Sequence, residues 1–250
     1  MKIIGIIPAR YASSRFPGKP LARITGKSMI QRVWEQASSA KCFSQVIVAT
    51  DDIRIKNHVD RFGGAAIMTS SRHRTGTERI GEAIKKIPGI SADDIVFNIQ
   101  GDEPFVKPGS FNLLVRCFVS KEIQIATLAV KLTGSEELHN PNVPKVIINK
   151  FRDAIYFSRA PVPWCRGFEK QDWTKHHTYY QHIGIYAYRA GILRKIIKLP
   201  PSPLEIAESL EQLRWLENGY AIKVALTDHK SISVDTPEDI ERAEKFLQEK

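Results

Sequence analysis

A loop rich in cations follows the first apolar segment of the chain. It reads PARYASSRFPGKP over residues 8–20 and places Arg10, Arg15 and Lys19 at regular spacing. Cations spread along a loop can each bind one phosphate of a nucleoside triphosphate. A basic surface loop is the alternative, but the position directly after a buried strand favours a ligand site. The loop therefore predicts a triphosphate-binding segment.

A second glycine-containing stretch looks like a phosphate-binding loop and is not one. Gly26-Lys27-Ser28 matches the end of a Walker A motif, but the first glycine of that motif would fall at position 21, which is Leu21. The stretch also follows an extended loop instead of a strand. We therefore exclude a P-loop and interpret Ser28 as the N-cap of the helix that follows.

Two more polar segments flank predicted elements. HRTGTER, residues 73–79, precedes a helix whose first backbone N–H groups suit an anion or a base edge. A capping role for Thr75 or Thr77 explains the same residues equally well. NIQGDEP, residues 98–104, closes a buried strand and places Asp102 where it can hold Mg²⁺, with an Asx-turn before Pro104 as the alternative.

The elements that must position these segments alternate along the chain. Apolar runs predict strands at 3–8, 46–49, 65–68, 94–99, 125–130, 145–148, 154–157, 183–188 and 221–226. Helical spacing predicts helices over 29–37, from 51, over 77–87 and over 203–219, and a last helix that opens at Asp235-Thr236-Pro237-Glu238. This alternation is typical of an α/β fold with a mostly parallel sheet, which gathers ligand sites at the carboxyl ends of its strands.

Composition limits the functional classes. The 250 residues carry a formal net charge of +10, which suits an anionic ligand but does not choose among nucleic acid, membrane and small phosphates. The three cysteines have no zinc-binding or disulfide spacing. The apolar N-terminal run is too short for a signal sequence or a membrane span, so we expect a cytoplasmic protein that binds no membrane.

A family resemblance joins these motifs. The strings PARYASSRFPGKP, HRTGTER, NIQGDEP, ATLAV, YFSRAPVPW, HIGIYAYRAG, PSPLE, LEQLRWLE and VDTPEDIERA resemble, in order and spacing, the bacterial 3-deoxy-manno-octulosonate (Kdo) cytidylyltransferases. The resemblance covers essentially the whole chain. It implies one Rossmann-like nucleotidyltransferase domain over 1–250, with a nucleotide-binding half near 1–125, a smaller sugar-binding and dimerisation region near 126–220, and a return to the main sheet over 221–250.

The resemblance also implies an activity and its partners. CMP is transferred from CTP to an acidic 2-keto sugar, pyrophosphate is released, and the sugar is thereby activated for lipopolysaccharide synthesis. The implied cofactor is Mg²⁺ and the implied assembly is a homodimer. The sugar's anomeric hydroxyl attacks the α-phosphorus, a step that needs positioning and charge neutralisation more than a covalent helper.

The resemblance implies roles for particular residues. The triphosphate clamp consists of Arg10, Arg15 and Lys19. The CTP contacts are Ala9, Arg74, Thr75, Gly76, Thr77 and Gln100, the last near ribose or sugar. The magnesium pair is Asp102 and Asp235, both at strand ends, with helix capping as the alternative for Asp235. The sugar pocket consists of Arg159, His182, Tyr186, Glu211 and Gln212, with a satisfied buried histidine and an exposed helix charge as alternatives for His182 and Glu211.

Three residues depart from the pattern expected of this family. Arg74 stands where Gln is more frequent, Cys165 stands where an acidic residue is frequent, and Pro144 precedes the strand that begins at Lys145. Two rival functions remain. In the first, the acceptor is another acidic sugar, such as a sialic or modified octulosonic acid. In the second, the chain is a nucleic-acid-binding protein that kept the nucleotidyltransferase fold. Absence of RRM, KH and zinc-finger motifs weighs against the latter.

Overall fold

The computed structural model describes residues 1–12, 16–230 and 233–248. The chain forms two compact units. The first comprises Met1–Asn112, Tyr188–Ile197 and Ser231–Lys250, and the second Leu113–Ala187 and Lys198–Lys230. The second unit begins earlier than the expected division near residue 125. It also includes the segment 222–227, which the sequence analysis assigned to the return to the main sheet.

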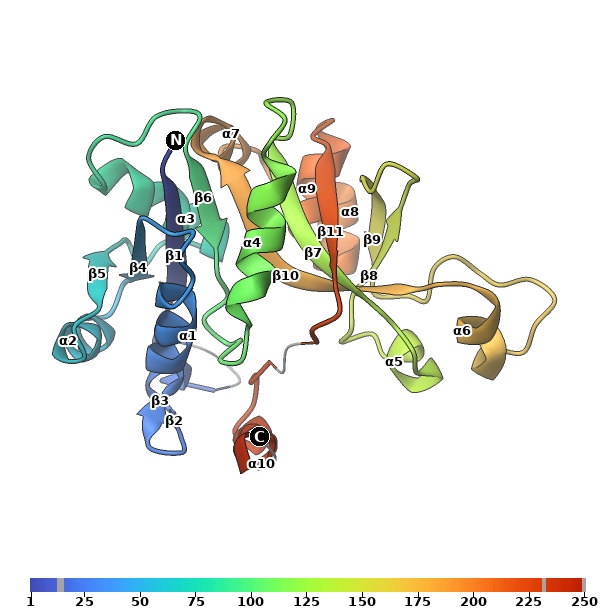
Figure 1. Ribbon diagram of the computed structural model, residues 1–250, viewed down its shortest axis with the longest axis horizontal. Helices are drawn as coiled ribbons and strands as arrows, with labels where there is room; N and C mark the ends of the chain where they lie inside the picture. Colours follow the sequence, from blue (N-terminus) through green and yellow to red (C-terminus); the bar gives the residue numbers. More distant parts are fainter. Residues whose placement is uncertain (13–15, 231–232, 249–250) are drawn as a thin grey trace. The chain divides into compact units, whose positions relative to one another are not determined.

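Parallel strands form the centre of the first unit. β1 (Ile3–Ala9), β4 (Gln45–Thr50), β5 (Ala65–Met68) and β6 (Ile95–Asn98) pair in the order β6-β1-β4-β5, all in parallel (Figure 1). Ile4, Ile6 and Ile7 of β1 are fully buried. A parallel sheet is covered on both faces, so its strands are near-continuous apolar runs, which is why the sequence predicts them well.

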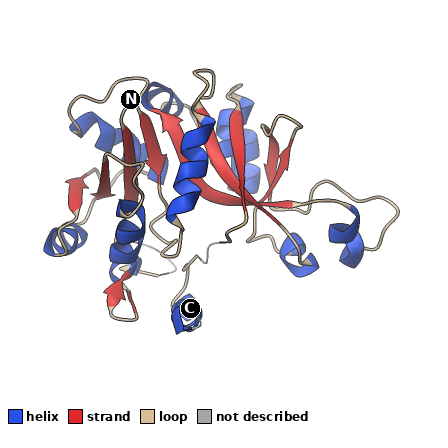
Figure 2. Cartoon of the chain, in the orientation of Figure 1, coloured by secondary structure: helices blue, strands red, loops and turns tan. Residues whose placement is uncertain are grey.

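Helices surround these strands (Figure 2). They are α1 (Met29–Ser38), α2 (Ile53–Arg61), α3 (Gly76–Lys86) and α7 (Ala190–Ile196). The last helix of the unit, α10 (Glu238–Gln248), packs instead through Ala243 in a cluster with Ile24 and Met29. A 3₁₀ turn, η1 (Lys19–Leu21), and a short antiparallel pair, β2 (Arg23–Ile24) and β3 (Lys27–Ser28), lead into α1. Ser28 caps α1 as predicted, because its hydroxyl accepts the Gln31 N–H at 3.2 Å.

The second unit holds mixed strand pairs. β7 (Ile125–Lys131) and β11 (Ile222–Thr227) pair in parallel, whereas β8 (Lys145–Ile148) pairs antiparallel with β9 (Ala154–Ser158) and with β10 (Tyr180–Arg189). The remaining elements are α4 (Pro108–Cys117), α5 (Ser135–His139), η2 (Lys170–Asp172), α6 (Trp173–His176), α8 (Pro203–Glu208) and α9 (Gln212–Glu217). α4 and β10 include residues of both units. The α/β class with a mostly parallel sheet is confirmed.

Two helix predictions were wrong in detail. The single helix expected over 203–219 is interrupted, because Ser209 adopts a left-handed conformation with φ 50° and ends α8. The last helix begins at Glu238, the final residue of the predicted opening, so Asp235, Thr236 and Pro237 lie before it. Across the part of the chain that is described, no helix combines the length and apolarity needed to cross a membrane.

Candidate active site

A cavity of about 240 Å³ opens at the carboxyl ends of β1 and β6 in the first unit. Polar and basic side chains form much of its wall. Its lining residues are Pro8, Ala9, Arg10, Lys19, Pro20, His73, Arg74, Thr75, Gly76, Arg79, Gln100, Gly101, Asp102 and Asp235. Segments from both ends of the first unit's sequence therefore meet at one place, as the strand-end rule for parallel sheets predicts.

Glycines allow this convergence at the end of β1. A Cβ on Gly76 would lie 3.1 Å from Cγ of Pro8, and a Cβ on Gly101 would lie 3.0 Å from the Pro8 carbonyl oxygen. The start of α3 and the segment after β6 thus approach β1 so closely that a Cβ at either glycine would require its neighbour to shift by a few tenths of an ångström. This close packing places the HRTGTER and NIQGDEP segments on one cavity.

Two carboxylates converge on one ammonium group in this cavity. Lys19 Nζ lies 2.9 Å from Oδ2 of Asp102 and 3.2 Å from Oδ1 of Asp235. The backbone joins the same two segments, because the Val234 N–H donates to the Asp102 carbonyl at 2.9 Å. The carboxylate of Asp239 accepts the N–H groups of Asp235 and Thr236 at 2.8 and 3.0 Å. The turn before α10 therefore has a carboxylate acceptor other than Asp235.

The donor set fits Mg²⁺. Carboxylate oxygens are the ligands this ion prefers, and the Lys19 ammonium shows that the space between Asp102 and Asp235 accepts a cation. No cluster of three or more His, Cys, Asp or Glu side chains with metal-binding geometry occurs within the described ranges. Two protein carboxylates match the usual pattern for Mg²⁺, which takes its other ligands from phosphates and water.

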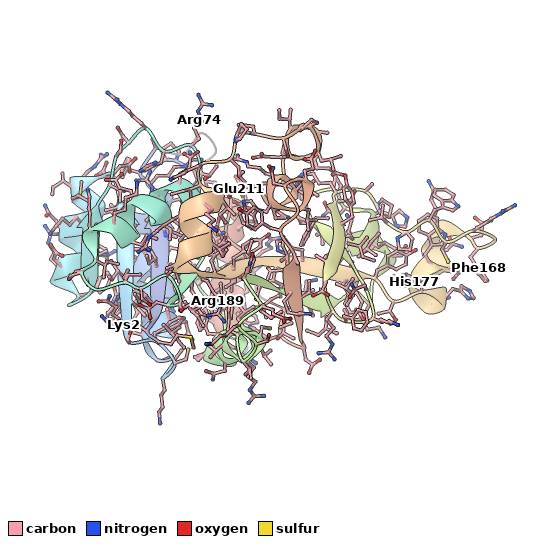
Figure 3. All side chains as sticks on the ribbon, turned by 90° about the horizontal axis from the view of Figure 1, so that it is seen from above. Lys2, Arg74, Phe168, His177, Arg189 and Glu211 are labelled. Carbon is pink, nitrogen blue, oxygen red and sulfur yellow. The ribbon has the colours of Figure 1, made fainter. Side chains whose placement is uncertain are left out.

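The turn before α3 is built by capping. Thr75 is the N-cap, since its hydroxyl accepts the Glu78 N–H at 3.1 Å, and Glu78 Oε2 accepts the Arg74 N–H at 2.7 Å. Thr75 and Gly76 line the cavity, whereas Thr77 is buried in the first turn at 2% exposure. The Arg74 side chain is exposed at the cavity wall (Figure 3).

A buried arginine near the cavity was missed by the sequence analysis. Arg79 is 3% exposed, and its guanidinium donates to Thr69 Oγ1 at 2.7 Å and to Asp51 Oδ2 at 3.0 Å. It ties the start of α3 to the ends of β4 and β5. The string HRTGTER contained Arg79, but its partners lie 10 and 28 residues away in the sequence.

A histidine and a carboxylate form a second missed pair. His73 lines the cavity, and its Nε2 lies 2.5 Å from Glu82 Oε2, which also accepts the Ser70 N–H at 2.9 Å. Burial tends to raise the pKa of Glu82, but hydrogen bonds from Lys86, Ser70 and His73 outweigh burial and lower it to about 2. Glu82 therefore stays charged and fixes the orientation of the His73 ring.

The structure describes two of the three predicted clamp cations. Lys19 lies among the carboxylates described above, and Arg10 lines the cavity with an exposed side chain. Arg15 lies outside the described residues. Ala9 and Gln100, which the resemblance implies as CTP contacts, also line the cavity.

The predicted sugar residues all belong to the second unit. His182 is 7% exposed, and its Nε2 lies 3.0 Å from Thr127 Oγ1. That hydroxyl also lies 2.9 Å from the Ile185 carbonyl and 3.2 Å from the Ile183 carbonyl. If this hydroxyl donates its one proton to a carbonyl, His182 Nε2 is the protonated nitrogen that donates to Thr127. Nδ1 is then the acceptor nitrogen.

Arg159 connects three backbone segments. Its guanidinium donates to the carbonyls of Glu208 at 2.7 Å, Pro141 at 3.0 Å and Ser209 at 3.4 Å. The Arg159 carbonyl accepts from Lys145 Nζ at 2.5 Å, and burial lowers the pKa of Lys145 to about 8. Arg159 therefore holds the ends of α8 and β9 in place, whether or not it also contacts a ligand.

The other predicted sugar residues lie around α9 and β10. The Tyr186 ring is 5.3 Å from His182 and 5.1 Å from Trp215, centroid to centroid. Glu211 is the N-cap residue of α9 and Gln212 is its first residue. Gln212 is 5% exposed, and its Nε2 has no hydrogen-bond partner among the described residues. A buried amide donor without an acceptor is costly, so this group suits an oxygen of a ligand.

The structure shows the surroundings of Pro144 and Cys165, two of the residues that depart from the family pattern. The Pro144 carbonyl accepts the His182 N–H at 2.9 Å, so this proline lies beside a predicted sugar residue. Cys165 is a free cysteine that packs against the buried cluster of Leu132, Leu138, Trp173 and Tyr179. Its surroundings are those of a packing residue.

Burial predicts that His182 stays neutral through the physiological range, because desolvation lowers its pKa to about 3. Between that value and the ordinary value near ~6.5, the unfolded chain binds a proton that the folded chain does not. His182 therefore gives the free energy of unfolding no pH dependence above about pH 6.5. Below that pH, it lowers the free energy of unfolding by about 1.4 kcal/mol per pH unit.

The free energy of unfolding, measured with urea at several pH values from 7.5 to 5, should show this dependence on pH. His182→Gln should reduce the number of protons taken up on unfolding in this range by one. An NMR titration of His182 with a midpoint near pH 6.5 would contradict the prediction.

The chain matches proteins of known activity over nearly its full length. A family model described as Cytidylyltransferase matches residues 4–248. A relative from Parabacteroides distasonis named 3-deoxy-manno-octulosonate cytidylyltransferase is 54% identical over 251 residues, which cover 99% of this chain and 98% of the relative. A relative of the same name from Thermodesulfovibrio yellowstonii is 48% identical, with 99% of this chain and 98% of the relative covered.

Solved structures agree with these matches. A CMP:2-keto-3-deoxy-manno-octonic acid synthetase complexed with CTP is 39% identical and has a TM-score of 0.91, with 100% of this chain and 99% of that chain covered. A 4-diphosphocytidyl-2C-methyl-D-erythritol synthase from Anaerococcus prevotii has a TM-score of 0.62 at 17% identity, with 99% of each chain covered, and shows likeness of fold alone.

Proposed function

Because the chain belongs to the 3-deoxy-manno-octulosonate cytidylyltransferase family, we propose that the cavity at the ends of β1 and β6 is the site at which it uses CTP. The protein is a nucleotidyltransferase that transfers CMP from CTP to 3-deoxy-manno-octulosonate and releases pyrophosphate. The observation that carries the site proposal is the convergence of Lys19, Asp102 and Asp235 in that cavity. The product is an activated sugar for lipopolysaccharide synthesis.

The reaction makes one bond and breaks one bond. The anomeric oxygen of the sugar bonds to the α-phosphorus of CTP, the bond from that phosphorus to the bridging oxygen breaks, and the hydroxyl proton goes to solvent. Transfer of this kind depends on in-line positioning and on neutralising charge at the phosphates. In our proposal Arg10, Arg15 and Lys19 supply fixed positive charge to the triphosphate.

Mg²⁺ is the proposed cofactor, held by Asp102 and Asp235. When bound, the ion neutralises charge on the phosphate oxygens. The two carboxylates by themselves would repel a triphosphate, so their place in a nucleotide cavity is best explained by a cation between them. Lys19 supplies one positive charge there, which leaves the pair with a net negative charge.

The nucleotide contacts follow from the cavity wall. We propose that the turn of Thr75 and Gly76 presents backbone groups to the cytosine edge, and that Ala9 and Arg74 support this contact from the cavity wall. In the same proposal, Thr77 supports the contact from the first turn of α3, where it is buried, and Gln100 lies near the ribose or sugar. The proposed sugar contacts are Arg159, His182, Tyr186, Glu211 and Gln212. Neutral His182 can accept a sugar hydroxyl at Nδ1, and Gln212 Nε2 can donate to a sugar oxygen.

CTP should be preferred over UTP and ATP. A purine is larger than the pyrimidine that the turn at Thr75 and Gly76 is proposed to contact, and uracil reverses the donor and acceptor at ring position 4. An unmatched buried polar group costs ~1–3 kcal/mol, or roughly 5- to 150-fold in kcat/KM. Pyrophosphate release measured with each nucleotide and the same sugar tests this. Equal turnover with ATP or UTP would contradict the proposed base contact.

A homodimer in the cytosol is the proposed working form. The excursion from Pro161 to Tyr180 around α6 carries exposed apolar side chains, with Trp164 67% exposed and Phe168 48% exposed. Figure 3 shows Phe168 on this excursion. Exposed aromatic side chains of this kind are typical of protein interfaces. Light scattering at micromolar concentration should give twice the mass of the chain, and Trp164→Ser should shift it towards one chain. A monomeric wild-type protein would contradict this proposal.

A further inference from the structure

Tyr11 lies within the loop that carries the proposed clamp cations, and its ring has a cationic partner. The guanidinium carbon of Arg54, at the start of α2, lies 3.4 Å from the centre of the Tyr11 ring. This is a close cation–π contact with the face of the ring. Neither residue has a place in the clamp, the magnesium pair, the base contacts or the sugar pocket.

The Arg54 guanidinium is itself held in a fixed plane. Its Nε donates to Asp52 Oδ1 at 2.9 Å, and its Nη2 donates to Asp52 Oδ2 at 2.6 Å. Asp52 is also the N-cap of α2, because Oδ1 accepts the Arg54 backbone N–H at 2.8 Å. The two-point contact sets the orientation of the guanidinium, and the cap ties it to the end of β4.

Tyr11 also packs against Gly18. The Gly18 N–H donates to the Tyr11 carbonyl at 2.9 Å, and φ of Gly18 is 72°. A Cβ on Gly18 would lie 3.2 Å from Cζ and from Oη of Tyr11. Gly18 directly precedes Lys19, whose ammonium lies between the two carboxylates of the cavity. Tyr11 thus contacts both Arg54 at the start of α2 and Gly18, the residue that leads into Lys19.

We propose that Tyr11, stacked on Arg54, is a positioning residue that holds Arg10 and Lys19 in the geometry that binds the triphosphate of CTP. This inference depends on the proposed function in one respect, that CTP is the ligand of the cavity. The contact fixes the loop before the nucleotide arrives, so CTP binding does not have to order it. Loss of the contact should weaken CTP binding and leave the chemical step unchanged.

The test compares four variants in calorimetry with CTP and in steady-state kinetics. Tyr11→Leu removes the aromatic face and should raise the Kd and KM for CTP about 10-fold, with kcat within about twofold of wild type. Arg54→Ala removes the partner cation and should raise both constants about threefold. Tyr11→Phe keeps the ring and should behave as wild type. Lys56→Ala, which removes an exposed ion pair with Asp60 on the same helix, is the matched control and should change nothing.

The double variant of Tyr11→Leu and Arg54→Ala separates this proposal from general damage to the loop. Because both changes break one contact, the double variant should be no weaker in CTP binding than Tyr11→Leu alone. Multiplying effects, an unchanged Kd in both single variants, or a loss with Tyr11→Phe as large as with Tyr11→Leu would overturn the inference. Wild-type protein that binds CTP but releases no pyrophosphate with any acidic sugar would overturn the proposed function alone.

Discussion

Asp235→Asn should lower kcat by about 10²-fold or more, equivalent to about 2.7 kcal/mol of barrier, and leave the melting temperature unchanged. Asn caps helices about as well as Asp, so the substitution keeps any capping role, but Asn is a much weaker Mg²⁺ ligand. The structure supports this separation, because the carboxylate of Asp239 accepts the N–H groups at the turn before α10. Initial rates across a Mg²⁺ series, with thermal melts of the same samples, measure both properties.

Asp102→Asn should give the same loss, and raised Mg²⁺ should rescue either variant only partly. Asp60→Asn is the matched control, because Asp60 pairs with Lys56 on the exposed face of α2 and should not affect the rate. Full activity of Asp235→Asn at low Mg²⁺ would show that Asp235 has a structural role only. The proposed two-carboxylate magnesium site would then be wrong.

Lys19→Ala should reduce kcat/KM for CTP by about 10- to 150-fold. The loss of one charge-assisted contact to the triphosphate costs about 1.5–3 kcal/mol. The ammonium also lies between Asp102 and Asp235, so its removal leaves two carboxylates facing an anionic substrate. Lys19 lies in a short 3₁₀ turn outside the strands, so thermal melts should show little change.

A second clamp variant and a control variant accompany Lys19→Ala. Arg15→Ala should also weaken CTP use by about 10-fold or more, for the same reason. Lys27→Ala, which removes an exposed ion pair with Glu35 and not a cavity cation, is the control and should keep wild-type kinetics. Near-wild-type kcat/KM for Lys19→Ala would refute the proposed clamp.

Local signals explain why much of the fold was predictable. β1, β4 and β6 are buried on both faces of a sheet, so their sequences are unbroken apolar runs that need no tertiary information. The capping residues Ser28 and Thr75 are also local signals, since each hydroxyl accepts an N–H three residues later. The strand-end rule then places Lys19 and Asp102 at one cavity from sequence position alone.

Features that depend on distant partners were not predictable. The break at Ser209 lies in a stretch with helical apolar spacing, and it is accompanied by an ion pair between Glu205 of α8 and Arg214 of α9. The role of Arg79 depends on Asp51 and Thr69, which fold alongside it from other elements. The sequence near Ser209 and the sequence near Arg79 contain no pattern that predicts these contacts.

The most direct test of the account measures pyrophosphate release from CTP and Mg²⁺ with a panel of acidic sugars. The panel contains 3-deoxy-manno-octulosonate, a sialic acid, a modified octulosonic acid and a reaction without sugar. We predict rapid release with 3-deoxy-manno-octulosonate, with CMP-sugar formed in equal amount, and slow or no release with the others. Release that is as fast with another sugar, or absent with 3-deoxy-manno-octulosonate, would contradict the account.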